Sequence, residues 1–144
     1  MIKIEYPLYQ PKIKNTAGKD FIFDPFRKRW VMLTPEEWVR QNFLQYMAET
    51  LHYPASLIAV EKQLLLGDVK KRFDIVVYDK ETKPFMIIEC KEMNVSLSEN
   101  VLQQVLRYNT NIQARFLVIT NGSHCFGFEK KSDEFIEIST MPVF

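Results

Sequence analysis

The sequence predicts an α/β or α+β fold in which a mixed sheet is flanked by helices. A helix pattern is followed by three strand patterns, a second helix pattern and two more strand patterns. Each helix pattern opens on residues that are typical of helix starts. The 144 residues are 47% hydrophobic and 26% charged, which suits one domain with a sizeable core. Helices and strands in this order are expected to pack as layers.

The first part of the chain predicts an extended arm. Prolines at positions 7 and 11 and a glycine at 18 lie among scattered lysines, and one edge strand is expected near residues 2–6. We place the arm at residues 1–25 and a single domain at residues 26–144. Residues 21–23 and 27–31 predict a short strand pair or a structured loop.

Residues 34–51 predict the first helix. Thr34 can cap it, Pro35 suits the first helical position, and Glu37 completes a capping box with Thr34. At about 100° per residue, Glu36 falls near the middle of the apolar face and Glu37 at its edge. We therefore expect Glu36 to be the inward-pointing carboxylate, with Glu37 as the alternative.

Three consecutive strands are predicted at residues 59–66, 69–78 and 85–91, with turns at 67–68 and 79–84. A capping box at residues 96–99 opens a second helix that extends to about residue 111. A continuous apolar strand follows at 115–120, and a turn leads into a strand at 124–128. Residues 135–138 predict an edge strand.

Charged residues interrupt two of these strands. Asp74 lies in one apolar run, and Glu89 and Lys91 lie in the next. If the turn is centred between residues 81 and 82, Asp74 faces Glu89 with Cβ atoms about 5 Å apart. Glu89 and Lys91 share a face because they are two residues apart, whereas Cys90 points into the core. Unpaired charges in core strands cost several kcal/mol, roughly, so the pattern predicts a neutralised ion cluster or a divalent-cation site.

Other residues are expected near this site. Carboxylate oxygens suit Mg²⁺ or Mn²⁺ rather than Zn²⁺. Gln104 falls near the centre of the predicted buried face of the second helix, and Tyr108 follows four residues later. A buried glutamine needs hydrogen-bond partners, which a polar site would supply. The basic run Lys70, Lys71 and Arg72 could contact phosphates, although short basic runs are usually solvated.

Composition excludes several classes. The net charge of +1 does not indicate a nucleic-acid binder, so any basic surface must be local. No apolar run approaches the length of a membrane span, and no phosphate-binding loop of an ATP-driven motor is present. The two cysteines match no zinc spacing and no signal peptide is recognised, so we expect a cytoplasmic protein without membrane contact.

Several motifs resemble a known superfamily. Asp74 followed by Glu89-Cys90-Lys91 resembles the PD-(D/E)xK nuclease motif, with Phe73 in place of the proline. Residues 104–108 resemble the QxxxY motif of its RecB-like and restriction-enzyme branches. Residues 34–41 resemble the opening helix of the nuclease domain at the N-terminus of type I restriction enzyme R subunits. The resemblance covers roughly residues 26–128.

The resemblance implies a restriction-endonuclease-like αβββαβ core and Mg²⁺-dependent (or Mn²⁺-dependent) hydrolysis of DNA phosphodiester bonds. The catalytic residues that it implies are Asp74, Glu89, Lys91, Gln104 and Glu36. Of these, Asp74 and Glu89 would hold the metal. Glu36 would be a further metal ligand on the outer side, with Glu37 as the alternative. Lys91 would position the attacking water or help to deprotonate it.

The resemblance also implies contacts beyond the metal site. Gln104 and Tyr108 would support the site or touch the DNA backbone. An R subunit also contains a helicase portion that this sequence lacks, so expected partners are DNA, a helicase or translocase domain, and restriction-modification subunits.

Two alternatives stay open from the sequence. The chain could be a catalytically inactive module that keeps the nuclease fold and docks to DNA or protein; this alternative predicts no specific metal binding. It could also be a nuclease that acts on RNA or on single-stranded ends. The residues do not distinguish these substrates.

Overall fold

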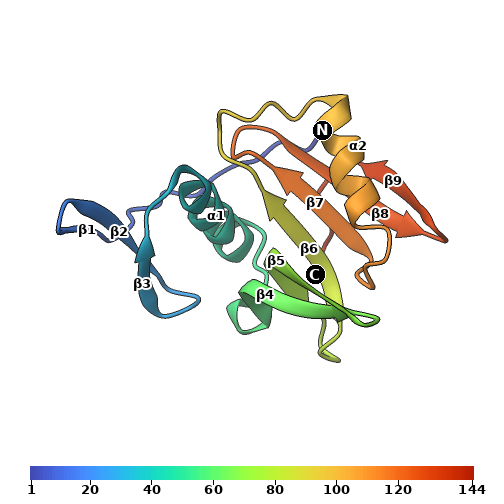
Figure 1. Ribbon diagram of the computed structural model, residues 1–144, viewed down its shortest axis with the longest axis horizontal. Coiled ribbons are helices and arrows are strands. Elements are labelled where there is room, and N and C mark those ends of the chain that lie inside the picture. Colours follow the sequence, from blue (N-terminus) through green and yellow to red (C-terminus); the bar gives the residue numbers. More distant parts are fainter.

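The computed structural model describes residues 1–144 as two β-sheets and two helices, an α+β fold (Figure 1). The helices are α1 (Pro35–Gln45) and α2 (Glu99–Tyr108). The small sheet contains β1 (Ile13–Thr16), β2 (Lys19–Asp24) and β3 (Arg29–Met32). The large sheet contains β4 (Ile58–Leu66), β5 (Val69–Tyr78), β6 (Pro84–Cys90), β7 (Phe116–Thr120), β8 (Cys125–Lys131) and β9 (Glu134–Ile138).

The strands of the large sheet lie side by side in sequence order. Neighbouring strands are antiparallel except β6 and β7, which are parallel and are joined through α2. The predicted order of helix, three strands, helix and further strands is therefore confirmed, and so is the edge strand near the C-terminus. None of the helices is long and apolar enough to cross a membrane.

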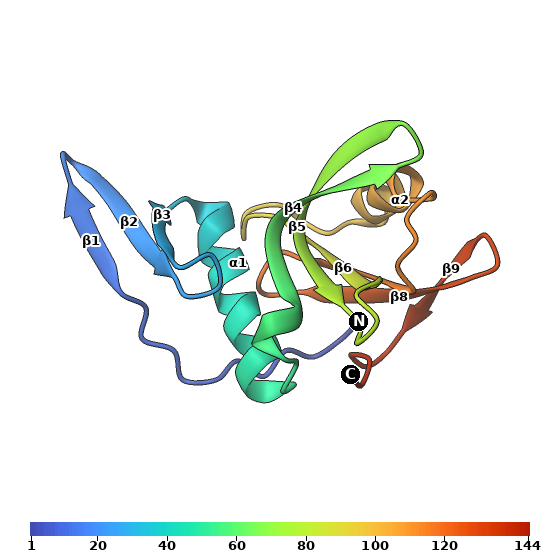
Figure 2. The same cartoon turned by 90° about the horizontal axis from the view of Figure 1, so that it is seen from below.

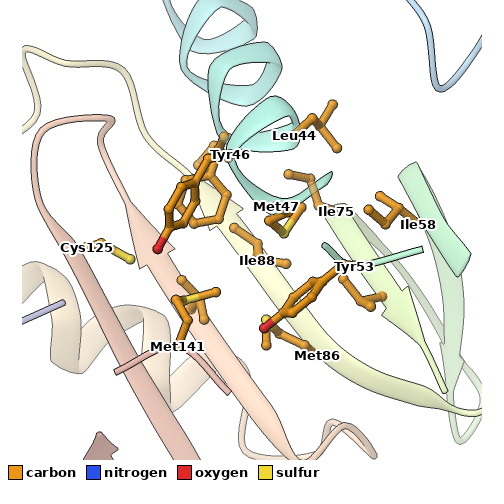
Figure 3. Packing of buried hydrophobic residues seen from close by; sticks show 14 of the residues in the cluster. Leu44, Tyr46, Met47, Tyr53, Ile58, Ile75, Met86, Ile88, Cys125 and Met141 are labelled. Atoms are coloured by element: carbon orange, nitrogen blue, oxygen red, sulfur yellow. The ribbon is translucent and has the colours of Figure 1, made fainter. Parts of the chain in front are cut away.

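The helices cover opposite faces of the large sheet, because alternate residues of its strands belong to different apolar clusters. Figure 3 shows Met47 beside Ile75 and Ile88, in the cluster that also holds α1 residues. On the other face, Leu102 and Val105 of α2 belong to a second cluster. Burying one such side chain contributes roughly 1.5–3 kcal/mol, so these clusters hold both helices on the sheet.

Helix α1 begins as predicted but ends differently. Thr34 Oγ1 accepts a hydrogen bond from the backbone N–H of Glu37 at 3.0 Å. The Glu37 carboxylate does not return to Thr34, because it binds arginine side chains instead, so half of the capping box forms. The chain continues from α1 into a π-helical turn, Tyr46–Thr50, and a 3₁₀ turn, Ala55–Leu57, leads into β4.

Helix α2 is shorter than predicted. Its N-cap is Ser98, whose Oγ accepts from the backbone N–H of Val101 at 3.3 Å, rather than Ser96. The helix ends at Tyr108, and the side chain of Asn109 donates back to the Val105 carbonyl at 2.7 Å. This side-chain bond satisfies a carbonyl of the last turn, and the chain leaves the helix there.

The predicted register between β5 and β6 is confirmed. Ile75 pairs with Ile88 and Val77 pairs with Met86, and one further step along this register sets Asp74 opposite Glu89. A bulge between Val77 and Tyr78 shifts the pairing next to the turn. The Asp79 carboxylate organises this turn by accepting from the backbone N–H groups of residues 81 and 83 at 2.8 and 3.0 Å.

The N-terminal region differs from the predicted arm. Residues 1–12 contain no strand, so the edge strand expected near residues 2–6 is absent, although the N–H of buried Ile2 donates to the Cys125 carbonyl at 2.7 Å. Strands β2 and β3 match the predicted pair, and β1 adds a third strand that the sequence did not indicate. Figure 2 shows this small sheet beyond α1, on the side away from the large sheet.

Candidate functional site

The candidate site lies where β5 and β6 are opposed. One oxygen of Asp74 accepts from the backbone N–H of Cys90 at 2.8 Å, and the other accepts from Arg40 at 2.9 Å. On the register of β5 and β6, Glu89 lies opposite Asp74. Lys91 follows at the end of β6, where its backbone N–H donates to the Thr120 carbonyl at 2.8 Å. The three charged residues predicted to share a site are therefore brought together.

Burial and the charge of Asp74 raise the pKa of both glutamates at this site. Burial, followed by the charge of Asp74, raises the pKa of Glu89 to about 8, while Lys71 and Lys91 act in the opposite direction. Burial and Asp74 also raise the pKa of Glu36, whose carboxyl is 49% exposed. Carboxyl groups this close cannot all ionise freely without added positive charge. Glu36, Asp74 and Glu89 therefore act electrostatically as one cluster.

Arg40 of α1 supplies part of that positive charge. Its side chain is 6% exposed, and it contacts Asp74 at 2.9 Å, Glu37 at 2.6 Å and Glu36 at 3.2 Å. No role was assigned to Arg40 from the sequence. Its position four residues after Glu36 was the available signal, because residues with this spacing are neighbours on a helix.

Arg27 anchors a second layer of this ion network. It lies in the turn after β2 and pairs with the fully buried Asp24, with Glu37 at 2.8 Å and with Glu61 at 3.2 Å. Its side chain is 11% exposed, so it belongs to a buried ion cluster. The network connects the small sheet to α1 and, through Arg40, to Asp74.

The orientation predicted for the two helix glutamates is wrong. Glu37 is buried, and its carboxylate is held by Arg27, Arg40 and Gln41, whereas Glu36 is exposed at the edge of the site. The helical wheel assumed one buried face, but the small sheet packs on a second side of α1 and buries that side too. Glu36 nevertheless lies beside Asp74, so its role as the outer carboxylate stays a prediction.

The other side of the site is a pocket beneath α2. Its volume is about 220 Å³, and its lining includes Lys71, Glu89, Lys91 and Tyr108. Lys71 Nζ donates to the Tyr108 carbonyl at 2.9 Å and to Asn109 Oδ1 at 3.0 Å. Burial lowers the pKa of Lys71. Asn109 was not singled out from the sequence; its only signal was its place at the predicted end of the helix.

The predicted burial of Gln104 is wrong. Gln104 is exposed, and Tyr108 is 70% exposed, because α2 packs on the sheet through Leu102, Val105 and Asn109. Tyr108 still lines the pocket, whereas Gln104 does not. Of the predicted phosphate contacts, Lys71 lies in the pocket, and its sequence neighbours Lys70 and Arg72 are exposed outside it.

The carboxylates of this site are suited to a hard divalent cation, although their side chains do not converge on one point as metal ligands do. Asp74, Glu89 and Glu36 offer only oxygen ligands. Burial, followed by the charge of Asp74, raises the pKa of both glutamates. No group of three or more His, Cys, Asp or Glu side chains has a metal-binding arrangement. Arg40 occupies one Asp74 oxygen and one Glu36 oxygen. By ligand chemistry, these residues fit Mg²⁺ or Mn²⁺.

Fold and site together define an α+β domain with a cluster of carboxylates and lysines at one end of a mixed sheet. A family model, type I restriction enzyme R protein N terminus (HSDR_N), matches residues 35–142. The chain belongs to this family, which confirms the family expected from residues 34–41. No match was found among curated proteins.

A solved structure is also similar to part of the chain. It is that of the type IIG restriction endonuclease BpuSI, with 20% sequence identity and a TM-score of 0.43. The matched region covers 67% of this chain and 11% of the BpuSI chain. The matched region therefore spans a small part of the length of the BpuSI chain.

Proposed function

We propose that this chain is the Mg²⁺-dependent DNA endonuclease domain of a type I restriction-modification system, with a restriction-endonuclease-like αβββαβ core. The observation that carries the proposal is the opposition of Asp74 and Glu89, with Lys91 beside them. Burial and the neighbouring Asp74 raise the pKa of Glu89 to about 8. Burying two carboxyl groups side by side lowers the stability of the fold, so a contribution to stability does not explain the arrangement. Strongly perturbed groups in a pocket are typical of functional sites.

In this proposal, Asp74, Glu89 and Glu36 hold Mg²⁺ or Mn²⁺. When bound, such an ion would lower the pKa of a water molecule and neutralise phosphate charge. Arg40 positions Asp74 through the contact at 2.9 Å, and the Cys90 N–H holds the second oxygen of Asp74 at 2.8 Å. These two contacts restrict the carboxylate to one orientation.

The lysines of the pocket contribute the remaining chemistry. Lys91 orients the attacking water or accepts its proton, because its side chain and that of Glu89 line the same pocket. Lys71 is held by the C-terminal end of α2 and provides positive charge for a phosphate group. Tyr108 lines the same pocket, and in this proposal its side chain contacts the DNA backbone.

Plasmid cleavage with Mg²⁺ tests the proposal. Lys91→Ala should lower the cleavage rate by roughly 10²–10⁴-fold, the usual contribution of a proton-transfer group. Lys70→Ala removes the same charge from an exposed position and is the matched control. Equal cleavage by wild type and Lys91→Ala would contradict the proposal.

Calorimetric titration with Mg²⁺ provides a readout that does not depend on a motor subunit. Wild type should bind the ion, and Asp74→Asn should bind it at least roughly tenfold more weakly, because one charged ligand is removed. Equal binding heats for the two proteins, or none for wild type, would count against the metal site. DNA, a helicase or translocase domain and other restriction-modification subunits are the partners that this function requires.

A catalytically inactive docking module is the second candidate. The observation that favours it is the contact of Arg40 with both Asp74 and Glu36, which already neutralises part of the cluster. A docking module predicts no specific Mg²⁺ binding. Cleavage that is sensitive to Lys91→Ala would exclude this candidate.

A further inference from the structure

One face of the small sheet makes no contact with α1. Ile22 and Asp24 of β2 are fully buried on the inner face, which is turned toward α1. The alternate residues of the strand, at positions 19, 21 and 23, point to the opposite face. Phe23 pairs with Trp30 across β2 and β3, and Lys14 pairs with Phe21 across β1 and β2. We call this side the outer face; its main residues are Lys12, Lys14, Lys19, Phe23, Trp30 and Met32.

Positive charge is concentrated in this part of the chain. Residues 12–32 contain six basic and two acidic residues, a net charge of +4, whereas the whole chain carries +1. Neither acidic residue belongs to the outer face. Asp24 is buried with Arg27, and Asp20 accepts a hydrogen bond from Asn15 on the inner side at 3.0 Å. The outer face therefore combines lysines with no opposing carboxylate.

Aromatic rings alternate with these lysines. Lys14 Nζ lies 4.4 Å from the centre of the Trp30 ring, and Lys12 Nζ lies 5.8 Å from the centre of the Phe23 ring. The two rings pack edge to face with centroids 5.5 Å apart. Trp30 is 37% exposed and Met32 is 47% exposed, so apolar surface is available between the ammonium groups.

We propose that the outer face binds an unpaired stretch of DNA, with rings and Met32 against bases and lysines against phosphates. Aromatic side chains within a basic surface are the usual means of binding single strands. A duplex would present phosphates but no base faces to the rings. A protein partner suits this face less well, because lysines are depleted at protein interfaces.

The inference rests on the proposed function only for the choice of DNA as the nucleic acid. The outer face lies outside residues 35–142, which the family model matches. It is nevertheless joined firmly to the candidate site, because Arg27 pairs with Glu37 and Glu37 pairs with Arg40. DNA that is held on the small sheet would therefore be kept attached to the domain that carries Asp74.

Fluorescence anisotropy with a short labelled single-stranded oligonucleotide, in EDTA, tests binding without cleavage. The double variant Lys12→Glu/Lys14→Glu should weaken binding roughly tenfold or more and lower the salt slope by about 1 for each phosphate that the lysines no longer neutralise. The matched control Lys80→Glu/Lys83→Glu changes the chain's charge equally at exposed positions of the β5–β6 turn. The single variant Lys19→Glu alters the outer face without disturbing the contact between Lys14 and Trp30, so weaker binding there cannot be ascribed to a displaced ring.

A second readout uses Trp30 itself. In a Trp38→Phe background, Trp30 is the remaining tryptophan, and the oligonucleotide should quench its fluorescence. Equal weakening by the double variant and its control, tighter binding of duplex than single strand, or unquenched Trp30 would each overturn the inference. If one of these outcomes is found and cleavage still depends on Lys91, the further inference fails and the proposed function stands. If the oligonucleotide binds as expected but the protein binds no Mg²⁺, the inference stands and the proposed function fails.

Discussion

The charged groups on the α1 side and on the α2 side of the candidate site are neutralised to different extents. On the α1 side, Asp74 and Glu37 are held by buried arginines at 2.6–2.9 Å. On the α2 side, Glu89 has a raised pKa, and it shares a pocket with the side chains of Lys71 and Lys91. The first side has the properties of a structural support. The second has the properties of a place where a ligand completes the charge balance.

Breaking the α1 side should have the largest effect on stability. Arg40→Met leaves the buried Glu37 and the half-buried Asp74 without their common partner, so the free energy of unfolding should fall by roughly 3–5 kcal/mol. Urea denaturation measures this change. Glu36→Gln is the control, because its carboxyl is 49% exposed and its removal should cost less than about 1 kcal/mol. A small change in the free energy of unfolding for Arg40→Met would show that the α1 side is not a structural support.

The α2 side should instead show itself in the pH dependence of stability. The folded state keeps the Glu89 proton to about pH 8, whereas the unfolded chain releases it near its ordinary pKa of 4.5. The folded state therefore binds more protons between these values, and stability should fall as the pH rises from 4.5 to 8. Glu89→Gln should raise the free energy of unfolding at the upper end by several kcal/mol, because a pKa difference of one corresponds to about 1.4 kcal/mol.

Asp74, Lys71 and Lys91 are the charged groups that act on Glu89, so the measurement compares wild type with Glu89→Gln over the same pH series in EDTA. The difference between the two proteins should grow from acid to neutral pH. In a separate series without EDTA, added Mg²⁺ should stabilise wild type at pH 8 more than it stabilises the variant. A difference that is constant with pH would show that Glu89 ionises normally.

The smallest effect is expected on the exposed surface of α2. Gln104→Ala should change stability by less than about 0.5 kcal/mol, because the side chain is exposed. If Gln104 contacts the DNA backbone, cleavage should slow by roughly 2–10-fold, which corresponds to one hydrogen bond. Gln103→Ala is the matched control, since Gln103 bonds to Glu99 at 3.0 Å and faces elsewhere. Equal cleavage by both variants would leave Gln104 without a role.

The sequence predicted the large sheet well because its information is local. Alternating apolar residues and the turn at 79–84 were sufficient to place Asp74 opposite Glu89. Helix orientation was harder, because a helical wheel assumes one buried face. The small sheet buries a second side of α1 through Arg27, and no pattern within residues 34–51 indicates that Glu37 would be enclosed.

The same limit explains the error at Gln104. The wheel of α2 was consistent with more than one orientation of the helix, and packing against the sheet selected the stripe through Leu102 and Val105. The role of Arg40 depends equally on tertiary contacts. Its partner Asp74 comes from a different element, which only the folded chain brings next to α1.

The parallel pairing of β6 and β7 has a consequence for folding kinetics. All other neighbours in the large sheet are joined by short hairpins, but β6 and β7 meet only after the chain has crossed the sheet through α2. Long loop closure slows folding, so this pairing should form late. Pulsed hydrogen exchange should therefore protect amides in β5 before the N–H of Lys91, whose acceptor is Thr120 on β7. On this sequence of events, Lys91 takes its final place only when both halves of the sheet have joined.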